Sequence, residues 1–139
     1  MRFRIKTLPR ILIVHFKRFS YIGAKLKNPL NFDEEIQIDA EYMVLNNNDK
    51  LSPEEIAKEV NHVYKLYAII VHEGYSTSSG HYYSYIKNQD HPQKDTNCET
   101  QSMWYRYDDE VVKLVGPNLS SVRRSTQNAY ILFYKKYYL

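Results

Sequence analysis

The 139 residues are enough for one small domain, and 43% of them are apolar, which suffices for a hydrophobic core. The 19 basic and 16 acidic residues leave a formal net charge of +3, too balanced to indicate nucleic-acid binding on charge alone. The single cysteine, Cys98, excludes an internal disulfide framework and a cysteine-cluster zinc site, and it indicates a reducing compartment. No apolar run is long enough to span a membrane, so we expect a soluble cytoplasmic or nuclear protein without membrane contacts.

The first half of the chain predicts short strands and one helix. Residues 10–19 form a strand whose continuous apolar stretch, 11–14, is typical of a strand buried on both faces. Its end carries Lys17 and Arg18, which we interpret as basic side chains reaching out to solvent. Residues 25–38 predict one or two short strands. Ser52-Pro53-Glu54-Glu55 then combines an N-cap, a proline at the first helical position and a capping glutamate, which predicts a short helix to about residue 60.

The second half predicts a series of strands. A strand over 64–72 is expected to place Leu66, Ala68 and Ile70 on one face and the residues between them on the other. Gly74 and Gly80 bracket a polar run that predicts a mobile loop, and the polar residues 88–102 predict a flexible insertion. Further strands are expected at 81–87, 104–109, 111–115 and 128–138, with a helical turn or two in 118–126. The predicted fold class is therefore α+β, a mainly antiparallel sheet with one or two short helices.

Two aromatic strands could bring a histidine and an acid together. If the strands beginning at His81 and at Trp104 pair antiparallel, His81 can face Asp108, and facing residues lie roughly 5 Å apart at Cβ. A carboxylate at that distance could orient the imidazole, as in a nucleophile–histidine–acid triad. The same register pairs Tyr83 with Arg106 and Tyr85 with Trp104. A slip of one residue would bring Asp109 opposite the histidine instead, and the sequence leaves both acids open.

Simpler interpretations apply to most of these residues. A histidine at a strand start is more often structural than catalytic, and an acidic doublet is often only a turn; the glycine, loop and acid around His81 favour catalysis. Cys98 lies in a polar loop between acidic neighbours, without a helix N-terminus or nearby cation to favour the thiolate, so we interpret it as an exposed free thiol. The other four histidines lack metal-ligand spacing, and we expect structural or surface roles for them.

Four segments together resemble the catalytic domain of ubiquitin-specific proteases. Residues 8–19, LPRILIVHFKRF, are similar to the family's LPxxLxLHLKRF segment. Residues 67–74 followed by 79–85, YAIIVHEG and SGHYYSY, are similar to its histidine box. The segments 104–109 and 128–134, WYRYDD and NAYILFY, resemble its closing strands. The order is also that of the family, and the resemblance covers the chain apart from insertions at 39–63 and 88–102.

The resemblance implies a papain-like cysteine protease, a deubiquitinase that cleaves peptide or isopeptide bonds after the C-terminal glycine of ubiquitin. It assigns His81 as the general base and Asp108 as the residue that orients it, with Asp109 as a secondary candidate near the site. Gly80 and Tyr82 are expected to line the channel for the Gly-Gly end of ubiquitin, where a side chain at 80 would obstruct the substrate. The expected partners are ubiquitin and ubiquitinated proteins; the resemblance implies no cofactor, metal or nucleic acid.

The family's nucleophilic cysteine and zinc segment have no counterpart in these 139 residues. We therefore expect residues 1–139 to be the C-terminal, histidine-box portion of a catalytic domain, inactive alone and open to complementation by an N-terminal half that carries the cysteine. A sheet without its partner subdomain is also expected to expose apolar surface and to self-associate. The alternatives are a non-catalytic, ubiquitin-binding or regulatory relic of such a protease and, from another class, a tyrosine-rich domain for single-stranded RNA.

Overall fold

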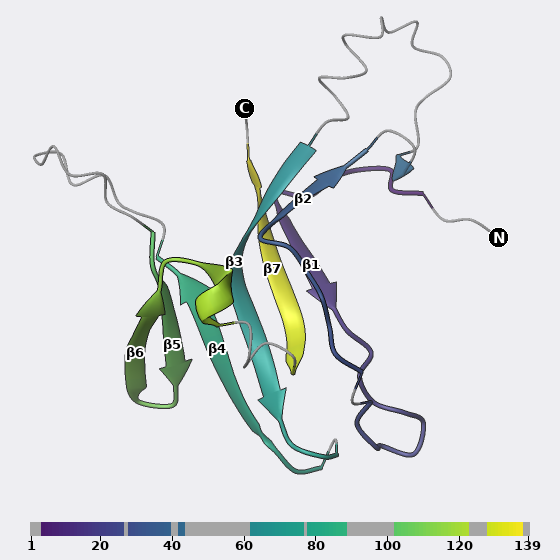
Figure 1. Ribbon diagram of the computed structural model, residues 1–139. Helices are drawn as coiled ribbons and strands as arrows, with labels where there is room; N and C mark the ends of the chain where they lie inside the picture. The colour runs from purple at the N-terminus through teal and green to yellow at the C-terminus, as the bar shows by residue number, and fades with distance from the viewer. Residues whose placement is uncertain are drawn as a thin grey trace, which may run out of the picture.

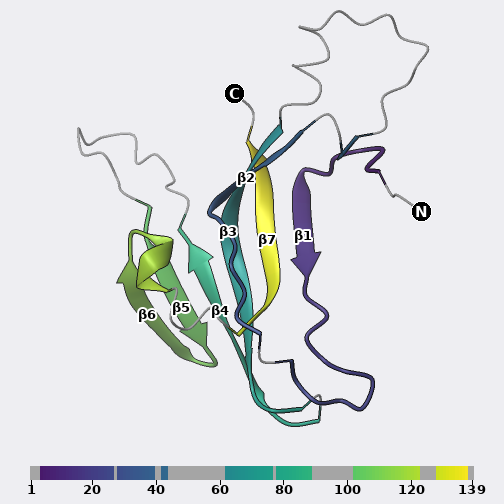
Figure 2. The same cartoon turned by 45° about the vertical axis from the view of Figure 1, so that its right-hand side comes forward.

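A computed structural model describes residues 4–26, 28–39, 42–43, 62–76, 78–88, 102–122 and 128–137. Seven strands form one antiparallel sheet in the order β1-β7-β3-β4-β5-β6, with β2 also paired to β3 (Figure 1). The strands are β1 (Ile11–His15), β2 (Glu35–Ile38), β3 (His62–Glu73), β4 (His81–Lys87), β5 (Trp104–Asp108), β6 (Val111–Gly116) and β7 (Ala129–Tyr137). A short 3-10 turn, η2 (Leu119–Ser121), follows β6. The turned view in Figure 2 shows the β5–β6 hairpin at one side of the sheet and β1 at the other.

The twelve-residue strand β3 is the centre of the sheet, because β2, β4 and β7 all pair with it. Irregularities in its pairing with β7 fall between Leu66 and Ala68 and again after Ile70. A bulge shifts the alternation of faces by one residue. The buried apolar side chains of β3 are accordingly Tyr64 and Leu66 before the first irregularity and Ile69 and Val71 after it. The expectation that Leu66, Ala68 and Ile70 share one face is therefore wrong, and the bulge is the reason.

The hydrophobic core lies against this central part of the sheet. Its largest fully buried side chains are aromatic: Trp104, Tyr64 and Tyr134. The hydroxyl groups of both tyrosines are hydrogen-bonded to main-chain carbonyls: Tyr64 donates to that of Pro9 at 2.5 Å and Tyr134 to that of Asp33 at 2.8 Å. Tyrosines are therefore used here as core residues whose hydroxyl groups are satisfied at the sheet's margin.

Two expectations for the first strand are wrong. β1 is an edge strand that pairs only with β7 in the described sheet, and Ile11 and Ile13 are exposed while Leu12 and Val14 pack against the core. An unbroken apolar run is compatible with burial of one face or of both faces, so the run alone does not distinguish an edge strand from a central one. Arg18 does not reach solvent either: it is 4% exposed and donates to the carbonyls of Ala129, Leu26 and Asn28.

Several expectations lie outside the described residues: the helix at 52–60, the insertion at 88–102 for all but its two ends, Cys98, and most of 118–126 beyond η2. The strands expected at 81–87, 104–109, 111–115 and 128–138 are confirmed, as β4, β5, β6 and β7. Within the described residues, none of the helical structure has the length and apolarity needed to cross a membrane.

Candidate active site

His81 is the first residue of β4 and lies where the chain returns from the loop after β3. Its cross-strand neighbour on β3 is Glu73. The loop before it is attached to the segment after β1, since Ala24 bridges Ser76 and the amide of Lys25 donates to the carbonyl of Tyr75 at 3.1 Å. His81 therefore lies at the start of β4, where two connecting segments meet, and its side chain is about half exposed.

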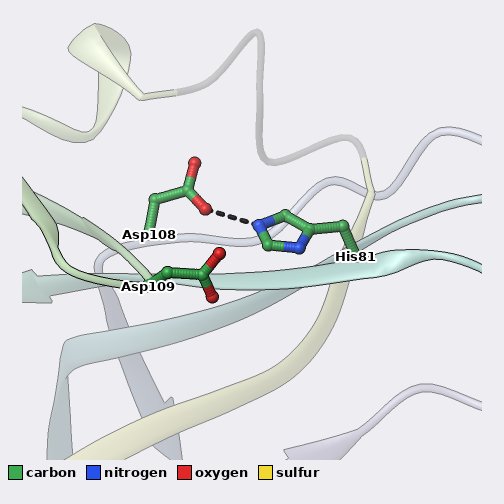
Figure 3. Close-up of side chains that lie close together, drawn as sticks. All are labelled: His81, Asp108 and Asp109. Carbon is green, nitrogen blue, oxygen red and sulfur yellow. Dashed lines mark hydrogen bonds and ion pairs between the residues drawn. The ribbon is translucent and has the colours of Figure 1, made fainter.

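The imidazole of His81 is hydrogen-bonded to Asp108, the last residue of β5 (Figure 3). The distance from Nε2 of His81 to Oδ1 of Asp108 is 2.5 Å. This hydrogen bond is the main cause that raises the pKa of His81 above its ordinary value, and it likewise lowers the pKa of Asp108. The structure thus brings together the two residues that the sequence analysis assigned to general base and orienting acid.

The register that brings them together differs from the expected one. β4 pairs with β5 so that Tyr85 faces Arg106 and Lys87 faces Trp104, two residues away from the pairing expected from the sequence. Tyr83 and Arg106 still meet, with the guanidinium carbon 4.1 Å from the ring centroid. Both this contact and the His81–Asp108 bond are diagonal, and long side chains can make them because diagonal neighbours lie only about 7–8 Å apart.

Asp109 lies in the tight turn between β5 and β6 and has a φ of 51°, a left-handed conformation that aspartate tolerates better than most residues. Its carboxylate does not make the hydrogen bond to His81, but its charge helps to raise the pKa of that histidine. Donor atoms of His81, Asp108 and Asp109 lie within 4.8 Å of one another, a set that could hold a divalent cation. A cation bound through Nε2 of His81 would replace the hydrogen bond that Nε2 donates to Asp108.

Gly80 and Tyr82 flank the histidine and both rest on His72 of β3. Tyr82 is the cross-strand partner of His72, with ring centroids 4.6 Å apart, and its own side chain is 51% exposed. Gly80 has a φ of 155°, and a Cβ there would come within 2.2 Å of Nε2 of His72. His72 is 2% exposed, and burial is the main cause that lowers its pKa. Sequence reasoning assigned His72 no place in the site, although its position opposite Tyr82 follows from a β3–β4 hairpin.

The arrangement leaves one nitrogen of His81 available for chemistry. Nε2 is engaged by Asp108, and Nδ1 has no partner among the described residues. A carboxylate bound to Nε2 keeps the proton on that nitrogen and leaves the lone pair on Nδ1, which is the state a general base requires. The sheet therefore presents an oriented imidazole that could accept a proton from an incoming nucleophile.

An antiparallel sheet that presents a histidine–aspartate pair beside a glycine-flanked loop has the arrangement in which nucleophilic hydrolases hold their general base. Comparison with known proteins identifies the particular family: the model for ubiquitin carboxyl-terminal hydrolases matches residues 2–134. The chain belongs to this family, and the papain-like fold class expected from its motifs is confirmed.

Among curated relatives, human ubiquitin carboxyl-terminal hydrolase 17 is 34% identical over 131 residues, which cover 94% of this chain and 20% of that protein. Probable ubiquitin carboxyl-terminal hydrolase 16 of Schizosaccharomyces pombe is 31% identical over 92% of this chain and 22% of its own length. The chain thus spans about a fifth of the length of these relatives. A solved SAGA DUB module bound to monoubiquitin, containing Ubp8, Sgf11, Sus1 and Sgf73, shares the fold with a TM-score of 0.67 at 22% identity, over 98% of this chain and 25% of that one.

Proposed function

We propose that this chain supplies the general base and its orienting carboxylate to a deubiquitinase, a thiol-dependent hydrolase that cleaves after the C-terminal glycine of ubiquitin. The observation that carries the proposal is the hydrogen bond between Nε2 of His81 and Oδ1 of Asp108, which leaves Nδ1 for a thiol proton. In the proposed reaction His81 accepts the proton of a cysteine thiol, the thiolate attacks the carbonyl carbon of the scissile bond, and the imidazolium returns the proton to the leaving amine. Asp108 stabilises the imidazolium in between.

The nucleophilic cysteine in this proposal is not one of the 139 residues. The sequence contains only Cys98, whose acidic neighbours Asp95 and Glu99 disfavour a thiolate. We propose that an N-terminal, cysteine-bearing portion complements these residues, either in the same polypeptide or as a second chain, and that the 139 residues alone do not hydrolyse ubiquitin conjugates. A family with relatives about five times as long supports this. A lone cysteine suits a cytoplasmic or nuclear location, which we propose as well.

Ubiquitin recognition is assigned to the surface beside the histidine. Gly80 lets the ring of the buried His72 lie directly against the main chain before His81, and Tyr82 packs on the same His72 while its own ring is half exposed. The role of Gly80 is therefore indirect, because a Cβ there would meet His72 and not the substrate as expected from the sequence. An extended peptide ending in two glycines has little side-chain bulk, so it can lie close to the ring of Tyr82 and the imidazole of His81. The monoubiquitin bound in the related SAGA DUB module supports ubiquitin as the partner.

Titration of isotope-labelled ubiquitin with the 139-residue chain tests this assignment. We expect shifts at the C-terminal residues of ubiquitin, weakened by Tyr82→Ala. Tyr137→Ala is the matched control, because Tyr137 is also 51% exposed but lies at the end of β7. Equal effects of both substitutions, or no shifts at the ubiquitin tail together with tight binding of single-stranded RNA, would refute the proposal.

Catalysis is tested separately by adding a cysteine-bearing N-terminal portion from a family member. We expect hydrolysis of a ubiquitin C-terminal amide only with both parts present, and His81→Gln to lower the rate by about 10²–10⁴ while ubiquitin binding persists. Ubiquitin binding without hydrolysis in every combination would favour the regulatory relic over the enzyme. Labelling of Cys98 by a ubiquitin C-terminal electrophile would assign the nucleophile to this chain and contradict the proposed complementation.

A further inference from the structure

We propose that Arg106 is a positioning residue, which holds the Asp108 carboxylate in the orientation that meets His81. The inference deepens the proposed function and rests on it for its catalytic meaning. Nη2 of Arg106 donates to Oδ2 of Asp108 at 2.6 Å, while the other oxygen, Oδ1, bonds to His81 at 2.5 Å. Each carboxylate oxygen therefore has its own charge-assisted hydrogen-bond partner.

Asp108 needs such a second partner because of where it lies. It is the last residue of β5, directly before the turn that contains Asp109, and its side chain is 28% exposed. One hydrogen bond at Oδ1 leaves the carboxylate free to rotate about its bond to Cβ, a torsion without a sharp preference. A second bond at Oδ2 removes that rotation, so Oδ1 stays directed at the imidazole.

Arg106 is itself fixed by the sheet. Its guanidinium lies over the ring of Tyr83, with the carbon 4.1 Å from the ring centroid, and Tyr83 is 8% exposed. A planar guanidinium can stack on an aromatic face and still direct an in-plane N–H at a carboxylate, which the ammonium of a lysine cannot do. The ordered core is thus connected through Tyr83, Arg106 and Asp108 to the half-exposed His81.

For stability alone, Arg106 is an unfavourable choice. Its Nε is buried and has no hydrogen-bond partner in the described part of the chain, and its cross-strand neighbour on β6 is the like-charged Lys113. An unsatisfied buried donor and a facing like charge both oppose folding. The contact with Tyr83 and the bond to Asp108 offset them, and of these two only the bond to Asp108 connects Arg106 with the histidine.

The pKa of His81, followed by NMR in the 139-residue chain, distinguishes positioning from simple electrostatics by the sign of its change. Arg106→Met removes a positive charge, which alone would raise the pKa of His81 further, because Arg106 lowers it. If Arg106 positions Asp108, the substitution also loosens the hydrogen bond that is the main cause of the raised pKa, and the pKa falls toward its ordinary value. Lys113→Met is the matched control, since Lys113 carries the same charge beside the same carboxylate.

The other charges around the imidazole, Glu73 opposite it and Asp109 in the turn, are unchanged in both variants. A fall in Arg106→Met but not in Lys113→Met supports the proposal; a rise or no change in Arg106→Met overturns it. Should Arg106→Met not fold, Arg106→Lys gives the same test, with a fall again expected. In the unaltered chain, slow rotation of the Arg106 guanidinium by NMR is expected, and fast rotation would overturn the proposal. None of these measurements uses ubiquitin, so they can fail independently of the proposed function.

Discussion

Replacing Gly80 by alanine tests whether the residue before His81 packs directly on His72 of β3. In the structure a Cβ at this position would lie 2.2 Å from Nε2 of His72 and 2.8 Å from the carbonyl oxygen of Glu73. Both distances are shorter than non-bonded atoms accept, and the carbonyl belongs to the main chain of β3, so neither neighbour can yield without moving the sheet. The φ of 155° is in addition one that residues with a side chain rarely adopt.

The expected loss of unfolding free energy has two parts. A backbone conformation that disfavours a side chain costs about 1–3 kcal/mol. Overpacking against His72 and Glu73 costs about another 1–3 kcal/mol. We therefore expect Gly80→Ala to lower the free energy of unfolding by roughly 2–6 kcal/mol, which is a large part of the about 5–15 kcal/mol of a typical domain.

Urea unfolding of a double-mutant cycle with His72→Ala separates the two parts. Removing the ring relieves the contact at 2.2 Å but not the backbone strain, so Gly80→Ala should cost less in the His72→Ala background, by about 0.5–3 kcal/mol. A loss below 0.5 kcal/mol in the single variant, or no coupling in the cycle, would show that His72 does not lie beneath Gly80 and would refute the account of the loop.

Four further outcomes follow from the same structure. Because the pKa of the buried His72 is lowered, the unfolded chain binds its proton first, so the contribution of His72 to the unfolding free energy should fall as pH drops below about 6.5, whereas the raised pKa of His81 acts in the opposite direction. Urea melts at pH 8 and pH 5.5 should therefore show a less favourable change in the unaltered chain than in His72→Gln, and an equal change in both would contradict this. Arg18→Met should lower the unfolding free energy by about 3 kcal/mol by leaving three carbonyls without their charged donor, and an unchanged urea midpoint would contradict this. Asp109→Asn should keep the urea midpoint and lower the pKa of His81 by NMR only in part, because the hydrogen bond to Asp108 remains, whereas Asp109→Ala should also lose about 1 kcal/mol of unfolding free energy at its positive φ. Leu114→Lys, on the exposed side of edge strand β6, should reduce self-association in sedimentation at nearly unchanged stability; an equally associated variant would point to another surface.

The spacing of apolar residues and the aromatic composition of the segments predict most of the sheet, because alternating or aromatic segments bounded by polar runs are typical of strands. They were not sufficient for the register between β4 and β5. The expected pairing of His81 with Asp108 and the observed pairing of Tyr85 with Arg106 differ by two residues. A shift of two leaves every side chain on its original face, so hydrophobic alternation cannot distinguish the two registers.

For the same reason, the predicted residues of the site still lie together although the predicted register is wrong. His81, Tyr83, Arg106 and Asp108 lie on one face in either register, and the side chains are long enough to bridge the diagonal. Arg18 illustrates a harder case. Its three carbonyl acceptors belong to the segment after β1 and to the start of β7, more than one hundred residues away in sequence, and no local pattern predicts that an arginine is required there.

The buried His72 and the half-exposed His81 show how the position of a histidine on β3 or β4 determines its pKa. His72 lies within the sheet against Tyr82 and carries a lowered pKa, so it is neutral at physiological pH and serves as a rigid support. His81 lies nine residues later at the sheet's end, where Asp108 raises its pKa. An imidazole that must accept a proton from a thiol and keep it as an ion pair needs that raised affinity, and the neutral histidine beneath adds no opposing charge. The proton affinity of His81 therefore depends mainly on Asp108, and the orientation of the Asp108 carboxylate determines whether it can stabilise the imidazolium form of His81.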